Sequence, residues 1–173
     1  MSHIPLVIRV AGPADAAALT RFAARTFRET YLATCTPADV ESYVAEHFAP
    51  ARQVAELADP TLRTLLTFVD DTLAGYAQIR NGPAPASVPG DRPIEIARFY
   101  VDAPWHGRGI AAMQMAASLD TAHDGDVVWL GVYQHNARAV KFYEKSGFRV
   151  VGTSTFTMGT DVQDDYVMAR EVG

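Results

Sequence analysis

Residues 95–111 read Glu-Ile-Ala-Arg-Phe-Tyr-Val-Asp-Ala-Pro-Trp-His-Gly-Arg-Gly-Ile-Ala, and this stretch decides the fold. The apolar run that ends at Val101 predicts a β-strand, and the apolar residues 110–119 predict a helix. The turn Gly107-Arg108-Gly109 joins them. The first N–H groups of such a helix have no partner within it, and the helix dipole makes that end positive. The stretch therefore predicts a strand, a glycine turn and a helix that together bind a phosphate or pyrophosphate.

The glycine spacing excludes two common nucleotide sites. It departs from the dinucleotide pattern G-x-G-x-x-G and from the P-loop pattern G-x-x-x-x-G-K-[ST]. The expected strand context also lacks an acidic residue that would bind a ribose. The sequence thus predicts neither a nicotinamide enzyme nor a P-loop NTPase, but a protein that binds a different nucleotide-linked anion.

Composition limits the class of protein. The 173 residues are 49% hydrophobic and 20% charged, which fits one globular domain over residues 1–173. A net charge of −5 argues against nucleic acid as a partner and is compatible with a cationic small molecule. Cys35 is the only cysteine, the N-terminus lacks a basic segment followed by a long apolar core, and no run reaches the roughly 18 apolar residues of a membrane span. We expect a cytoplasmic protein with no membrane partner.

The order of the predicted elements gives the fold class. The patterns predict strands at 6–10, 61–69, 72–80, 93–101, 126–133, 148–158 and 165–170, and helices from Asp15 to Tyr31, at 36–48, at 51–58, after the glycine turn, and at 137–145. Strands 93–101 and 126–133 are separated by a helix and are therefore expected to pair in parallel. Hairpins on either side add antiparallel strands, so the fold class is α/β with a mixed sheet. Segment 81–93 is expected to be an exposed loop, and Asp164-Asp165 a solvated strand start.

A second motif follows strand 126–133. Asn136 and Tyr143 are seven residues apart, close to two helical turns, so both lie along one face of the helix. The small Ala139 and Val140 between them leave room for a groove. Asn136 is also a good helix N-cap, and Tyr143 also fits a core aromatic, so both interpretations stay open.

The two motifs together resemble a known family. The segment from His106 to Ala111 resembles the Q/R-x-x-G-x-G/A segment of the GNAT (GCN5-related) N-acetyltransferases, and residues 136–148 resemble their N-x-x-A-x-x-F-Y-x-x-x-G-F segment. His106 departs from the usual Gln or Arg, which we expect to tune affinity only, because phosphate is bound mainly by backbone N–H groups. The closer resemblance is to PaiA-like spermidine/spermine acetyltransferases, at residues 27–31, 95–101, 129–132 and 152–165.

This resemblance implies a GNAT fold, with a mixed, mostly antiparallel seven-stranded sheet, a splayed parallel central pair and about four flanking helices. It implies acetyl-CoA as the co-substrate and no metal. The implied acetyl-CoA-binding residues are Phe99, Tyr100, Val101, His106, Gly107, Arg108, Gly109, Ile110, Ala111, Asn136 and Tyr143.

The resemblance also implies direct attack of a neutral amine on the thioester. Tyr143 would be the general acid, since a phenol with a reference pKa of about 10 is protonated at neutral pH. Glu95 would act as the base through water, or would only attract the cationic acceptor; the two alternatives are equally open. Glu29 and Tyr31 are weaker candidates for the acceptor wall.

The expected partners are acetyl-CoA and a small amine acceptor such as a polyamine, and the chain is expected to be a monomer or a homodimer. Within the same enzyme class the alternative acceptors are a protein N-terminus, an amino acid or an antibiotic amine. A different class is a regulatory module that binds acetyl-CoA without turnover. Tyr143 argues against such a module, because a protein that only binds acetyl-CoA needs no proton donor at the sulfur.

Overall fold

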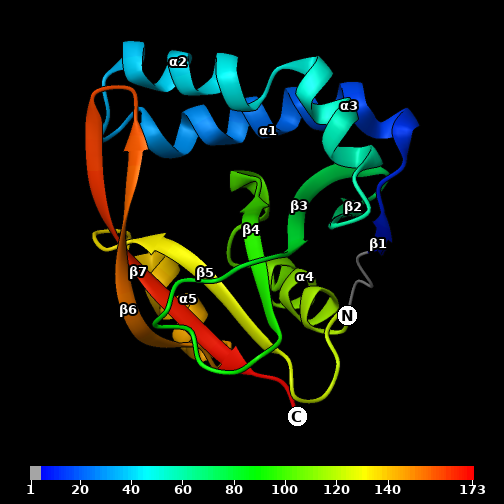
Figure 1. The fold of residues 1–173 in the computed structure, drawn as a ribbon. Helices are drawn as coiled ribbons and strands as arrows, with labels where there is room; N and C mark the ends of the chain where they lie inside the picture. The colour runs from blue at the N-terminus through cyan, green and yellow to red at the C-terminus, as the bar shows by residue number, and fades with distance from the viewer. Residues whose placement is uncertain (1–4) are drawn as a thin grey trace.

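A single seven-stranded sheet organises the protein (Figure 1). The structure is a computed structural model that describes residues 5–173, so the first residues of the N-terminal segment considered above lie outside it. The strand order is β1-β2-β3-β4-β5-β7-β6. The strands are β1 Leu6–Val10, β2 Leu62–Val69, β3 Thr72–Asn81, β4 Pro93–Val101, β5 Val127–Tyr133, β6 Arg149–Met158 and β7 Asp161–Glu171. The mixed α/β architecture is confirmed.

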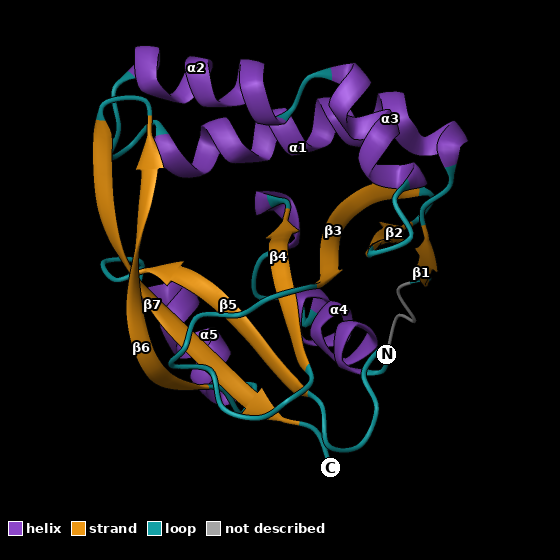
Figure 2. Ribbon diagram, in the orientation of Figure 1, coloured by secondary structure: helices purple, strands orange, loops and turns teal. Residues whose placement is uncertain are grey.

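Helices cover both faces of the sheet (Figure 2). They are α1 Ala16–Tyr31, α2 Pro37–His47, α3 Pro50–Ala58, α4 Ile110–Leu119 and α5 Ala137–Lys145, with short 3-10 turns at Pro13–Asp15 and Ala103–Trp105. There are thus five helices among residues 5–173, where about four were expected. The short α3, predicted at 51–58 from the sequence, has Gln53 as its only fully buried side chain.

A large apolar core lies on each face of the sheet, between the strands and the helices that cover them. One core joins α1 and α2 to the sheet through residues such as Phe27, Val40 and Tyr76. The other joins α4 and α5 to the opposite face through Met115, Tyr143 and Phe148. Strand side chains alternate between faces, and β4 contributes to both cores, with Tyr100 in the first and Ile96 and Phe99 in the second.

The antiparallel connections follow the sequence closely. Asp70 and Asp71 form the two-residue turn between β2 and β3 with positive φ values of 47° and 61°. A turn of this kind matches the twist of a hairpin, and aspartate tolerates the left-handed region better than most residues. The expectation for Asp164 and Asp165 was wrong, since β7 already begins at Asp161 and Asp165 is half-buried inside it.

No helix described over residues 5–173 combines the length and the apolarity that a bilayer crossing needs.

Candidate active site

The central parallel pair opens after three residue pairs. β4 and β5 pair from Pro93 with Val127 to Glu95 with Trp129. Beyond that point β4 continues on β3 and β5 continues on β7, but they no longer pair with each other. Alternate backbone N–H and C=O groups of β4 after Glu95 therefore face an opening instead of a strand. The splayed pair is confirmed.

A β-bulge in β4 coincides with the opening. Gln78 pairs with Arg98 and Ile79 with Ile96, so Ala97 is the extra residue. A bulge bends its strand and increases the local twist. As a result, Ile96 and Phe99, three residues apart, both pack into the core on the α5 face. We attribute the departure of β4 from β5 to this bend.

The glycine turn presents free donors beside the opening. Gly107 and Gly109 have φ values of 75° and 81°, and a Cβ atom on either would meet nothing within 4 Å. Within residues 5–173, no backbone N–H from Gly107 to Ala112 donates to a backbone carbonyl; the first that does is that of Met113, 3.2 Å from the Gly109 oxygen. These donors lie at the positive end of α4. The turn therefore fits a diphosphate.

His106 and Arg138 join the two sides of the opening. The His106 Nε2 lies 2.7 Å from the Val101 carbonyl, and the Arg138 Nη1 lies 2.8 Å from the His106 Nδ1. Because a guanidinium can only donate and a carbonyl can only accept, the imidazole is neutral with its proton on Nε2. The Val101 carbonyl is thus bonded to His106. The sequence reasoning missed Arg138, although it lies inside the Asn136 motif.

A buried glutamine fixes the end of β4. The Gln114 amide nitrogen lies 2.9 Å from the Tyr76 carbonyl and 3.2 Å from the Tyr100 carbonyl, and its oxygen accepts from the Thr67 hydroxyl at 2.8 Å. Phe99, Tyr100 and Val101, the predicted cofactor-binding residues of β4, thus follow the point where β4 leaves β5. The Tyr100 carbonyl is bonded to Gln114 and the Val101 carbonyl to His106. A long polar side chain in the mostly apolar α4 sequence was the available signal for Gln114.

Asn136 and Tyr143 lie on α5 as their spacing predicted. The Asn136 Oδ1 accepts from the Ala139 N–H at 3.2 Å, so Asn136 is a helix cap. Tyr143 is 9% exposed and packs edge-on against Phe99 and Phe148. Within residues 5–173 its hydroxyl has no hydrogen-bond partner. The hydroxyl oxygen is not completely buried. Burial raises the pKa of Tyr143, which keeps the phenol protonated.

Tyr31 is the predicted site residue on the other face of the sheet. It lies at the end of α1, on the face opposite α5, where it stacks with Phe156 of β6. Burial raises the pKa of Tyr31, and the charges of Asp165, Tyr43 and Tyr143 raise it further.

The two predicted glutamates both have arginine partners. The Glu95 carboxylate lies 3.0 Å from the Arg80 Nε. Burial raises the pKa of Glu95 and Arg80 opposes that shift. Glu29 is half-exposed and lies 3.2 Å from Arg25, which also binds Asp102 at 2.9 Å. The structure thus places Tyr31 and Tyr143 on opposite faces of the sheet, while Glu95 and Glu29 are held in ion pairs.

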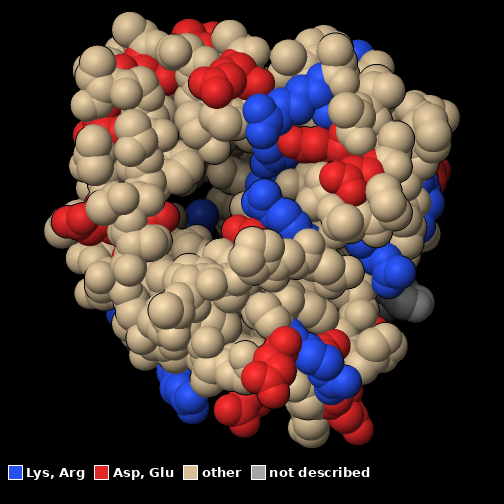
Figure 3. All heavy atoms as spheres, in the orientation of Figure 1, with Lys and Arg blue, Asp and Glu red and all other residues tan. Residues whose placement is uncertain are grey.

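The β6–β7 hairpin closes the rim of the opening against α2. The Asp39 carboxylate accepts from the Thr160 N–H at 2.8 Å, and Gly159 lies so close to Asp39 that a Cβ atom would collide with it. In Figure 1 the hairpin reaches α2, so that α1, the hairpin, β5 and β4 surround the opening. Figure 3 shows a deep hollow at this place, with charged side chains of both signs near its rim.

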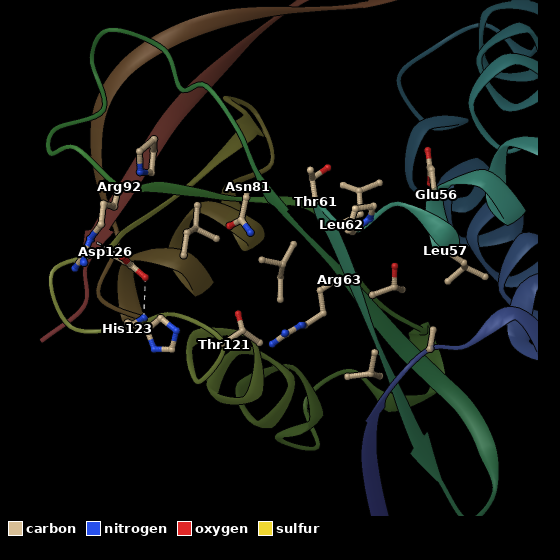
Figure 4. A pocket seen from close by; sticks show the side chains of 17 residues that line it. Glu56, Leu57, Thr61, Leu62, Arg63, Asn81, Arg92, Thr121, His123 and Asp126 are labelled. Carbon is tan, nitrogen blue, oxygen red and sulfur yellow. Dashed lines mark hydrogen bonds and ion pairs between the residues drawn. The ribbon is translucent and has the colours of Figure 1, made fainter.

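A cavity of about 450 Å³ lies elsewhere, at the start of β4 (Figure 4). It contains none of the predicted site residues, and its lining includes Pro93 and Ile94, where β4 and β5 are still paired. Asp126 in its wall bonds to Arg92 and to the His123 N–H. These polar groups hold the local structure, so we keep the opening as the candidate site. Within residues 5–173 no group of three His, Cys, Asp or Glu side chains is placed to hold a metal.

Comparison with known proteins shows the family of this chain. Residues 21–148 match the model of the Acetyltransferase (GNAT) family. An uncharacterized N-acetyltransferase of Mycobacterium bovis is 38% identical, over 91% of this chain and 98% of its own. The N-alpha-acetyltransferase RimI of Mycobacterium tuberculosis is 31% identical, over 80% of this chain and 85% of its own. The crystal structure of the PaiA N-acetyltransferase of Thermoplasma acidophilum in complex with coenzyme A superposes with a TM-score of 0.77, at 20% identity, over 98% of this chain and all of that one.

Proposed function

Because the chain belongs to the GNAT acetyltransferase family and is thus an acetyl-CoA-dependent N-acetyltransferase, we propose that its acceptor is a small primary amine of the polyamine class. One observation carries the proposal. β4 and β5 part beyond Glu95, beside the free N–H groups of the glycine turn, and Tyr143 packs against Phe99 of β4. The enclosure of this opening by α1 and the β6–β7 hairpin favours a slender acceptor.

The chain's backbone would hold the co-substrate. The N–H groups from Gly107 to Ala111 would bind the diphosphate, with Arg108 at its edge. The free backbone groups around Phe99 would pair with the amides of the pantetheine arm, as an added strand does. Asn136 would contact the arm from α5 through its side-chain amide N–H, since its oxygen caps the helix.

The reaction would proceed by direct transfer. Acetyl-CoA supplies a thioester whose carbonyl carbon accepts the amine. A backbone N–H of β4 near Phe99 or Tyr100 would donate to the carbonyl oxygen as negative charge develops on it. The new C–N bond forms, the C–S bond breaks, and Tyr143 gives its proton to the departing sulfur. The attacking nitrogen then loses one proton to give the neutral amide, and a proton delivered through water restores the phenol. The buried phenol suits this role because its raised pKa keeps the proton in place until the thiolate forms.

The acceptor ammonium must lose a proton first, because its pKa of about 10.4 keeps it charged at neutral pH. Glu95 would take this proton through water, or would only attract the cation. Its ion pair with Arg80 favours the second role, since a carboxylate that holds a guanidinium is a weaker base.

A second candidate acceptor is an α-amine. RimI, the N-alpha-acetyltransferase that is 31% identical, favours it. We would measure free thiol release from acetyl-CoA with spermidine, with free amino acids and with short peptides. Turnover with spermidine at the highest kcat/KM supports the proposal, whereas turnover with peptides or amino acids alone supports the α-amine. Tight acetyl-CoA binding without any amine-dependent release would contradict both and identify a binding module.

A further inference from the structure

Asp165 occupies the acceptor side of the opening. In β7 it pairs with Tyr133 of β5 and Ser154 of β6. Two and four residues on, Val167 and Ala169 pack with Trp129 on the face that α5 does not cover. Since side chains alternate along a strand, Asp165 lies on this face as well. It therefore shares a face with Tyr31, whose pKa its charge raises.

Gly131 leaves room for this carboxylate. It is exposed in the middle of β5, just past the last residue that pairs with β4. A Cβ atom on Gly131 would lie 3.5 Å from Oδ2 of Asp165. The carboxylate thus leans across β5 toward the gap, in the space that a side chain at position 131 would use.

Asp165 differs from the other carboxylates around the opening in having no partner. Glu95 lies 3.0 Å from Arg80, Glu56 2.7 Å from Arg98 and Asp102 2.9 Å from Arg25. The Asp165 carboxylate has no hydrogen bond and no ion pair to any residue in 5–173, although the residue is half-buried.

An unpaired carboxylate in this position is costly. Burial, and then the neighbouring Asp164, raise the pKa of Asp165 to about 6. A partly buried charge without a partner destabilises the fold unless a cation binds to it. Strongly perturbed groups of this kind cluster at functional sites, and a pKa of about 6 leaves the group ionised at neutral pH yet a better base than an ordinary aspartate.

We propose that Asp165 binds the ammonium group of the acceptor in the opening and takes its proton before the amine attacks the thioester. This inference rests on the proposed function. The N–H bond breaks, the proton passes to a carboxylate oxygen of Asp165, and the freed electron pair of the nitrogen forms the C–N bond. Glu95 then serves in its other role, to attract the cation.

The test compares Asp165→Asn with Asp164→Asn. Asp164 is the exposed neighbour on the other face of β7, so its variant is the matched control. At pH 8, with spermidine as acceptor, we expect Asp165→Asn to lose at least about 100-fold in kcat/KM, the size of effect that general base catalysis provides. The dissociation constant of acetyl-CoA should stay within about twofold, and the control should keep its activity.

The pH profile separates a base from a structural residue. The neighbouring charge of Asp164 on β7 raises the pKa of Asp165, and the charge of Asp165 in turn raises the pKa of Tyr31 on α1. Wild-type kcat/KM should fall as pH drops through about 6, since Asp165 becomes protonated, and Asp165→Asn should lack this limb. An unchanged kcat/KM and an unchanged acid limb in Asp165→Asn would overturn the proposal.

A relocation variant tests the position of the charge. Asp165→Asn combined with Gly131→Asp moves the carboxylate from β7 to the adjoining position on β5, which has room for it. Recovery of about tenfold over Asp165→Asn supports the proposal, while a double variant that binds acetyl-CoA normally without recovery contradicts it. Wild-type turnover with an amine, combined with an active Asp165→Asn, would refute only this inference. Absence of wild-type turnover with any amine would refute the proposed function and this inference with it.

Discussion

The two sides of the β4–β5 opening are built in different ways. On the side of α4 and α5, the candidate cofactor site consists mainly of backbone from one continuous stretch, β4 and the glycine turn, with free N–H groups from Gly107 to Ala112. On the side of α1, the proposed acceptor chamber would consist of side chains from distant segments, among them Tyr31 and Asp165. The difference suggests that cofactor binding tolerates side-chain changes, while acceptor choice depends on single side chains. Each prediction below tests this division.

Tyr143 lies where the two sides meet, and its loss should have the largest effect. Tyr143→Phe removes the proton donor but keeps the ring that packs against Phe99 and Phe148. We expect kcat to fall by about 100- to 1000-fold, since general acid catalysis commonly contributes that much. The dissociation constant of acetyl-CoA should change little. Steady-state kinetics and calorimetric titration measure the two quantities; an unchanged kcat would remove Tyr143 from the mechanism.

The rim of the acceptor chamber should respond next. Gly159→Ala places a methyl group against Asp39 at a residue whose φ is 59°. We expect a loss of about 2 kcal/mol of stability from strain and steric overlap together. Because the contact between α2 and the hairpin is loosened, the KM of the acceptor should rise about tenfold, while acetyl-CoA affinity is kept. A larger change in acetyl-CoA affinity than in the acceptor KM would show that the two sides are not separate.

Gly109→Ala is the corresponding substitution on the cofactor side. Gly109→Ala meets no steric obstacle, so its cost is the left-handed φ of 81° alone, about 1 kcal/mol. Because the strained residue precedes the free N–H groups of α4, we expect acetyl-CoA to bind about five- to tenfold more weakly. The acceptor KM at saturating acetyl-CoA should be unchanged. If acetyl-CoA affinity and the acceptor KM changed by the same factor, the two sides of the opening would not be separate.

The same division explains how much could be predicted from the sequence. The cofactor side was predicted because a strand, a glycine turn and a helix are local patterns, and because Asn136 and Tyr143 share one helix face. Arg138 and Gln114 were missed, since their partners His106 and Tyr76 lie far away in the sequence.

The acceptor side was predicted less well for the same reason. Asp165 was assigned to solvent because two adjacent aspartates are typical of an exposed turn. Its burial depends on how β7 pairs with β5 and on the absence of a side chain at Gly131, and neither can be inferred from local patterns. The bulge at Ala97, which we hold responsible for the opening, likewise leaves no local sequence signal.

The smallest predicted effect is a gain of stability at the acceptor side. Asp165 has a pKa of about 6 in the folded protein against a usual value of 3.8, so ionised Asp165 destabilises the fold. This cost is absent below the unfolded value and complete above the folded one, so it grows as pH rises from about 4 to about 6. Asp165→Asn should therefore raise the free energy of unfolding at pH 8 by about 1 kcal/mol, a figure reduced for the partial solvent exposure of the side chain. At pH 5 the gain should be about half as large.

Urea unfolding at the two pH values measures this difference, with Asp164→Asn as the control. A functional side chain that destabilises its own fold is expected where a cationic substrate supplies the missing partner. No such gain is expected from Tyr143→Phe, since burial raises the pKa of the phenol and keeps it neutral. If Asp165→Asn instead lowers the free energy of unfolding at pH 8, the carboxylate is stabilised by interactions within the fold. It would then not be an unpaired carboxylate that is available to bind an ammonium group.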